Sequence, residues 1–211
     1  MRTFHALLAS VLATGGLGAA VVVTDNASVT PTIGLNDTGY TGATANRFGW
    51  DAGESLTQSF TVPSAGFIDA IYIAYNGFDD GETLTLDLSV NGNLIASGIL
   101  LDGNNFSGDS GSDGNASPKY WMKFDLSTES VPVTAGSNNF SMTATADTGT
   151  SWAFAPMYSL NNDVYAGGTL SGSLFPGGND DLGFAVTVVP EPASAVLVAL
   201  AGLTLLCRRR Q

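Results

Sequence analysis

The sequence predicts an all-β protein built as an antiparallel β-sandwich. Gly accounts for 26 of the 211 residues, well above the usual ~7%, which is typical of a turn-rich chain. The segment Thr83 to Val90 alternates apolar and polar residues without a break, as a half-buried strand does. The body of the chain shows no sustained 3.6-residue period flanked by helix caps, so we expect any helices there to be few and short.

Each predicted strand rests on the same kind of pattern. Asn91-Gly92 follows the alternating segment and tolerates the positive φ angles of a type I′ turn, so Asn93 to Leu101 is predicted to return as the second strand of a tight hairpin. The other predicted strands are Ser55 to Val62, Ile68 to Tyr75, Tyr120 to Leu126, Asn139 to Ala146, Ser151 to Ala155 and Gly183 to Val189, with Val21 to Thr24 as an added edge. About seven to ten strands separated by Gly, Pro, Asn and Asp favour a sandwich of jelly-roll connectivity.

Composition excludes several classes of function. The formal net charge is −12, and only Arg47, Lys119 and Lys123 carry positive charge between the two ends of the chain, so nucleic acid is not an expected partner. His5 and Cys207 are the sole histidine and cysteine, and both lie in terminal segments. The body therefore lacks the residues for a Ser-His-Asp or Cys-His arrangement, for an ordinary zinc or iron-sulfur site and for a disulfide framework.

The N-terminal segment, residues 1 to 20, has the features of a secretory signal peptide. Arg2 gives a charged start, Phe4 to Leu12 is apolar, and Gly18-Ala19-Ala20 supplies the small residues that signal peptidase requires. We expect signal peptidase to cleave just before Val21.

The C-terminal segment combines three features in order. Val189 leads into Pro190-Glu191-Pro192, an almost wholly apolar stretch runs to Cys207, and Arg208, Arg209 and Arg210 precede the final Gln211. This segment closely resembles the PEP-CTERM sorting signal of exported bacterial proteins. The two prolines favour an open, extended motif, and the arginines are expected to stay in the cytoplasm by the positive-inside rule. Ala193 to Cys207 would make about 22 Å of helix against a hydrocarbon core of ~30 Å, which suits a transient anchor.

The resemblance implies a destination. A membrane-embedded exosortase-type enzyme would recognise Pro190, Glu191 and Pro192, remove the helix and tail, and leave the body at the cell surface or in the extracellular matrix. The chain then divides into a signal peptide (residues 1–20), a β-sandwich ectodomain (21–188) and a sorting signal (189–211).

The body also resembles the jelly-roll domains that often precede this signal. The residues that carry this second resemblance are Gln58-Ser59-Phe60-Thr61-Val62, Ile68-Asp69-Ala70-Ile71, Val133-Thr134-Ala135-Gly136, Tyr165 with Gly167-Gly168, and Asp181-Leu182-Gly183-Phe184.

One strand offers a candidate glycan contact. In Tyr120 to Leu126 the alternation places Trp121 on the polar face together with Lys123 and Asp125. A sugar ring could stack on the indole while Lys123 and Asp125 bond to its hydroxyls. The alternative is that a loop or a second layer covers Trp121.

Two carboxylate pairs are candidates for a structural calcium ion, which needs neither His nor Cys. Asp79 and Asp80 precede the clearest strand, and Asp180 and Asp181 precede the last one. Asp and Gly are equally common as plain turn residues. The loop Asp109 to Gly114 resembles a calcium loop but lacks two ligand positions, so a solvated loop is the favoured interpretation.

The sequence thus favours an exported, non-enzymatic protein of the cell surface or extracellular polysaccharide matrix. The alternative is a carbohydrate-binding module for that polysaccharide. A distant third is a glycosidase that would act through carboxylates alone, for which the body before the sorting signal offers Glu54, Glu82 and Glu129. No cofactor other than calcium is expected.

Overall fold

The computed structural model describes residues 21–25, 33–34, 45–47, 50–78, 81–106, 120–148, 154–159, 165–173 and 175–191. In these ranges the chain is all-β, and every strand pairing is antiparallel. The strands are β1 (Val22–Thr24), β2 (Ile33–Gly34), β3 (Ala45–Arg47), β4 (Ser55–Val62), β5 (Gly66–Phe78), β6 (Thr83–Val90), β7 (Asn93–Asp102), β8 (Tyr120–Asp125), β9 (Val131–Val133), β10 (Gly136–Asp147), β11 (Phe154–Ser159), β12 (Leu170–Gly172), β13 (Phe175–Leu182) and β14 (Phe184–Pro190). One short 3-10 helix, Gly103–Asn105, follows β7.

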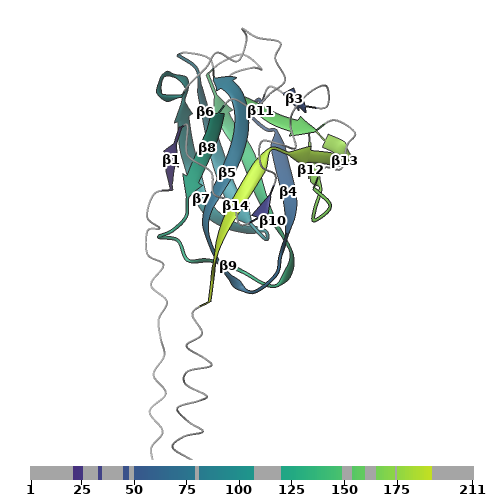
Figure 1. Cartoon of the computed structure of the whole chain (residues 1–211). Coiled ribbons are helices and arrows are strands. Elements are labelled where there is room, and N and C mark those ends of the chain that lie inside the picture. The colour runs from purple at the N-terminus through teal and green to yellow at the C-terminus, as the bar shows by residue number, and fades with distance from the viewer. Residues whose placement is uncertain are drawn as a thin grey trace, which may run out of the picture.

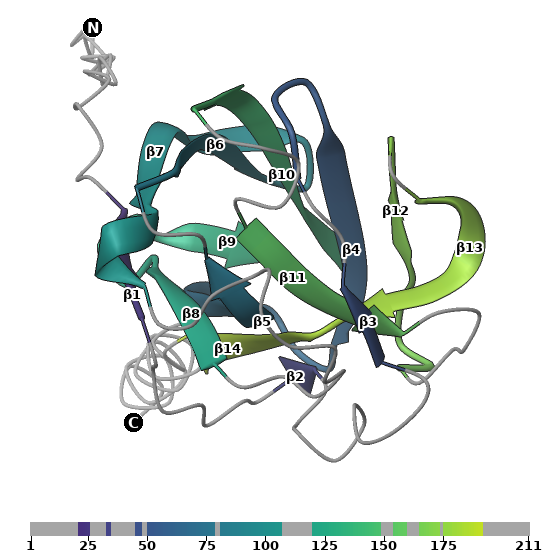
Figure 2. The same ribbon diagram turned by 90° about the horizontal axis from the view of Figure 1, so that it is seen from above.

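The strands form two layers (Figures 1 and 2). The first layer has the order β2-β14-β5-β8-β1, and the second has the order β12-β4-β10-β6-β7. Strands β11 and β13 connect the layers, because β11 pairs with both β5 and β13, and β13 pairs with β12. The path of paired strands therefore begins at β1 and ends at β7.

The core lies between the two layers. Each strand contributes alternate residues, so the face of β6 that carries Leu84, Leu86 and Leu88 is fully buried. Phe140 of β10 contacts Phe184 of β14 with ring centroids 5.8 Å apart, which joins the second layer to the first. Burial of these side chains is the main stabilising contribution for a body that has no cysteine.

Strand β5 is the central strand of the first layer and is buried on both faces. Ile71 and Ile73 face the core, while Ala70 and Ala74 lie on the opposite face, and all four are fully buried. The pattern of β5 is accordingly a nearly continuous apolar run and not an alternation.

The predicted hairpin between β6 and β7 is confirmed. Asn91 and Gly92 have φ values of 49° and 76°, the positive angles that a type I′ turn requires. The Asn91 side chain also holds the turn against β10, because its Oδ1 accepts from the Asn139 N–H at 2.9 Å.

Most predicted strands occur where the alternation placed them, but the segment around β11 and β13 differs. Of the strand predicted at Ser151 to Ala155, residues 151–153 lie outside the described residues, and the described strand β11 runs from Phe154 to Ser159. Strand β13 was not predicted because Phe175–Leu182 reads Phe-Pro-Gly-Gly-Asn-Asp-Asp-Leu, which has the composition of a turn. Its backbone is nevertheless paired with β11 and β12.

The terminal predictions fall outside the described residues. These are the signal peptide (1–20), Pro192, the apolar stretch to Cys207, and Arg208, Arg209 and Arg210. Among the described residues, no helix has the length and apolar character to cross a membrane.

Candidate functional site

Trp121 does not offer the stacking surface that the sequence suggested. The alternation was correct, since Met122 and Phe124 face the core and Trp121 lies on the other face of β8, beside Ala74 of β5. That face is covered here, however, and Trp121 is only 8% exposed. The structure therefore leaves little of the indole open to a sugar, which favours the alternative of a covered tryptophan.

Lys123 and Asp125 bind each other. Their side chains form an ion pair at 2.7 Å, and Asp125 also accepts from the hydroxyl and the backbone N–H of Ser127. The hydrogen bond from Lys123, followed by those from Ser127, lowers the pKa of Asp125 to about 2, and Asp125 raises the pKa of Lys123. These groups therefore stabilise the end of β8, and a sugar hydroxyl would have to compete with bonds already made.

Asp180 and Asp181, the second candidate pair for calcium, lie next to each other in β13, where neighbouring side chains point to opposite faces. Asp181 is buried and accepts from the Tyr165 N–H at 2.8 Å and from the Gln58 Nε2 at 3.3 Å. Its two oxygens thus have protein donors, and its role is to join β13 to β4.

Several of the residues that carried the jelly-roll resemblance belong to a network of contacts around Asp181. Gln58 is fully buried and its Oε1 accepts from the Leu182 N–H at 2.8 Å. The Tyr165 hydroxyl accepts from the Thr61 N–H at 3.0 Å, and its ring packs edge-on against Phe184. A Cβ on Gly168 would overlap the Ser59 carbonyl, so only glycine fits this crossing of β4. These residues are a structural junction.

The remaining acidic candidates do not form a site in the described part of the chain. Asp79 and Asp80 lie outside the described residues. Within the described ranges, no group of three or more His, Cys, Asp or Glu side chains is placed to hold a metal ion. Glu54, Glu82 and Glu129 lie in three separate turns, before β4, before β6 and after β8.

The described part of the chain ends at Pro190 and Glu191. Pro190 is the last residue of β14, two residues beyond the predicted boundary at 188, and the Glu191 N–H donates to the Ala65 carbonyl. Proline is tolerated there because the end of a strand needs no further ladder hydrogen bond. Val189 is 50% exposed, and Pro190 and Glu191 are also exposed. Figure 1 shows this end of β14 at the lower end of the two-layer body.

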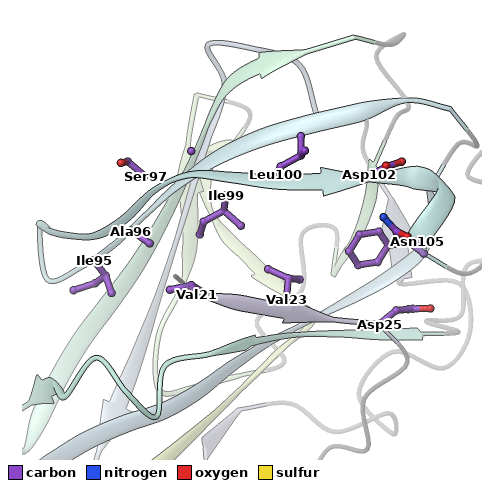
Figure 3. Close-up of a pocket in the computed structure, with 12 residues that line it drawn as sticks. Val21, Val23, Asp25, Ile95, Ala96, Ser97, Ile99, Leu100, Asp102 and Asn105 are labelled. Atoms are coloured by element: carbon purple, nitrogen blue, oxygen red, sulfur yellow. The ribbon is translucent and has the colours of Figure 1, made fainter. Parts of the chain in front are cut away.

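The structure reveals a cleft that the sequence did not predict. It has a volume of about 630 Å³ and lies between β1 and β7, the two ends of the strand path (Figure 3). It is lined by Val21, Val23, Asp25, Ile95, Ala96, Ser97, Gly98, Ile99, Leu100, Asp102, Asn105 and Phe106.

The two walls of the cleft differ in kind. Strand β1 and the two residues that flank it contribute alternate residues, Val21, Val23 and Asp25, and so present one side-chain face. Strand β7 contributes consecutive residues from 95 to 100, and so presents its backbone edge as well as its side chains. Leu94 and Leu100 on this strand are each 61% exposed, an unusual exposure for leucine.

The polar groups of the cleft gather at one end. Asp25 accepts a hydrogen bond from the hydroxyl of buried Tyr75. Asp102 caps the 3-10 helix, because its Oδ1 accepts from the N–H and the side-chain amide of Asn104 at 3.0 and 2.8 Å. Figure 3 shows Asp25, Asp102 and Asn105 at the same end of the cleft, with Val21, Ala96 and Ile95 toward the other.

A sequence signal for the cleft existed in β7. The strand Asn93–Asp102 breaks the alternation with Leu94-Ile95 and Ile99-Leu100-Leu101, so both faces carry apolar residues. Its pairing with β6 shifts register between Leu86 and Leu88 and again before Ser89, and Gly98 has a φ of 67°. Such bulges twist an edge strand away from its sheet.

Comparison with known proteins gives one partial similarity. No family model matches the chain. Over 114 residues the chain is 33% identical to the exo-beta-D-glucosaminidase of Amycolatopsis orientalis. The match covers 54% of this chain and 10% of that enzyme, so the chain spans about a tenth of the length of the curated relative it matches.

Proposed function

We propose that this chain is an exported, non-catalytic protein of the cell surface or extracellular polysaccharide matrix. Its body is a β-sandwich of jelly-roll connectivity, delivered by signal peptidase at the N-terminus and by an exosortase-type enzyme at the C-terminus. The strand orders β2-β14-β5-β8 and β4-β10-β6-β7 support that connectivity, because the chain crosses from one layer to the other between β4 and β5, between β5 and β6 and between β7 and β8, while β6 and β7 form a hairpin within the second layer.

The observation that carries this proposal is the position of the motif. The first two residues of the Pro-Glu-Pro triplet are exposed, Pro190 as the last residue of β14 and Glu191 directly after it. A processing enzyme could therefore reach the motif while the body stays folded, and cleavage beyond it would leave both layers intact.

The processing step is tested in a bacterium that carries an exosortase-type enzyme. The full chain and the variant Glu191→Ala are expressed there, with Val189→Thr as a control at an exposed position just before the motif. We expect mass spectrometry to find the shortened body outside the cell for the parent and the control, and the uncut chain in the membrane fraction for Glu191→Ala. Release of a shortened body from all three chains alike would contradict the role of the motif.

A second candidate function, binding of extracellular polysaccharide, is favoured by the cleft and by the partial similarity to a glucosaminidase. It is tested by co-sedimentation of the full chain with the polysaccharide of its own host. We expect saturable sedimentation both with and without a chelator. A chelator removes calcium, and the carboxylate of Asp181, a candidate calcium ligand, is already bonded within the protein. Failure to sediment in both conditions would leave a displayed protein without this activity.

A further inference from the structure

We propose that the cleft between β1 and β7 binds a polysaccharide of amino sugars whose free amines are protonated, such as a β-linked glucosamine chain. This inference rests on the second candidate function, glycan binding, and adds to it a location and a ligand class. Three properties of the cleft carry it: the apolar side chains in its lining, the carboxylates at one end, and the exposed edge of β7.

Apolar side chains in the lining fit the faces of sugar rings. Val23 and Ile99 lie on opposite walls, and half-buried Phe106 closes the end near the carboxylates. Phe106 is fixed edge-on against Tyr75, with centroids 6.2 Å apart. Pyranose rings have C–H faces that pack on such apolar and aromatic surfaces, while their hydroxyls remain at the rim.

The charge of the cleft selects the sugar. Asp25 and Asp102 enter the lining, and none of the described residues that line the cleft is a lysine or an arginine. A uronic acid or a sulfated sugar would be repelled by these carboxylates and by a net charge of −12. An ammonium group would be attracted, and charge-assisted hydrogen bonds to carboxylate are the strong kind.

The edge of β7 explains why the ligand would be a chain. The lining follows seven residues of β7 from Ile95 to Asp102, with Leu101 facing the core, so the cleft extends along the strand. Backbone amides and carbonyls at an edge strand can bond to hydroxyls on successive sugars. The bulge at Gly98 makes the same edge a poor partner for a straight peptide strand, because it interrupts the regular ladder.

The test measures binding by isothermal titration calorimetry with the purified full chain. The probes are a glucosamine hexamer, its N-acetylated counterpart of equal length, and hexalysine, all at pH 6. We expect the glucosamine hexamer to bind with an affinity at least about tenfold above that of the other two. Equal binding of the two sugar hexamers would overturn the choice of a cationic sugar and leave glycan binding in place. Equal binding of hexalysine would overturn the assignment to sugar.

Two variants locate the site. Asp102→Asn removes the charge but keeps a side chain that caps the 3-10 helix, and should weaken glucosamine binding about tenfold. Leu100→Ser alters a 61% exposed residue of the lining without disturbing the core, and should also weaken binding. The control Asp180→Asn removes one charge from β13, away from β1 and β7 in Figure 2, and should leave the affinity within about twofold.

The failure of this inference can be told apart from the failure of glycan binding. If the host polysaccharide binds but Asp102→Asn and Leu100→Ser bind it as the parent does, the cleft is not the site. If neither the hexamers nor the host polysaccharide bind, the glycan-binding function itself is wrong.

Discussion

At the scale of single residues, the buried carboxylate of Asp181 decides how β13 is held. It accepts one bond from Gln58 and one from the backbone of Tyr165. Asp181→Asn would turn an N–H₂ group toward one of these donors, so we expect a loss of about 1–3 kcal/mol in the free energy of unfolding. Urea denaturation measures this loss, with Asp180→Asn as the matched control on the same strand. An equal loss in both variants would contradict a special role for Asp181.

A second residue-scale prediction concerns the Lys123–Asp125 pair. Folding holds the pKa of Asp125 at about 2, below its ordinary value of 3.8, so the pair contributes stability above pH 4 and loses it as the pH falls toward 2. The pair is partly exposed, so Asp125→Asn should cost less than about 1 kcal/mol at pH 7. Thermal unfolding from pH 7 to pH 2 should show the difference in Tm shrinking between pH 4 and pH 2. A difference that stays constant over that range would mean that Asp125 acts through packing alone.

At the scale of elements, the close approach of β5 and β14 depends on one glycine. A Cβ on Gly66 would overlap the carbonyl of Val189, so Gly66→Ala must push the end of β14 away. We expect a loss of about 1–3 kcal/mol in the free energy of unfolding, together with faster proteolysis near Pro190. The control Gly92→Ala meets open space but has a φ of 76°, and should cost about 1 kcal/mol without added proteolysis near residue 190. Equal proteolysis in both variants would show that β14 tolerates the shift.

The elements also show how far the sequence determines the fold. Strands with one buried face, such as β4 and β6, could be predicted to the residue because alternation records which face meets the core. Strand β13 could not, since its Gly and Asp residues owe their strand geometry to pairing with β11 and β12. The sequence left open whether Trp121 is covered, because alternation gives the face of a residue but not what lies over that face. The cleft joins strands about 70 residues apart in sequence, so only their pairing order reveals it.

At the scale of the whole molecule, the C-terminal strand occupies an interior position. Strand β14 lies between β5 and β2, and its Phe184 and Val186 are fully buried. A chain that ends at Gly183 would lose these core side chains and leave one edge of β5 open to other chains. We expect this truncated chain to aggregate, as measured by size-exclusion chromatography. A truncation after Glu191 should stay monodisperse, and aggregation of both chains would show that residues beyond 191 are also needed.

The interior place of β14 has a consequence for how the molecule matures. A ribosome makes the chain from residue 1 onward, so the first layer lacks a middle strand until residues 184 to 190 have been made. Long-range pairings of this kind close slowly, and the unfinished layer has to avoid wrong partners in the meantime. The last strand to arrive is also the one that leads into the exposed motif, so completion of the fold and presentation of the motif coincide in time. A processing enzyme that acts only after this point would release finished bodies and leave unfinished ones behind.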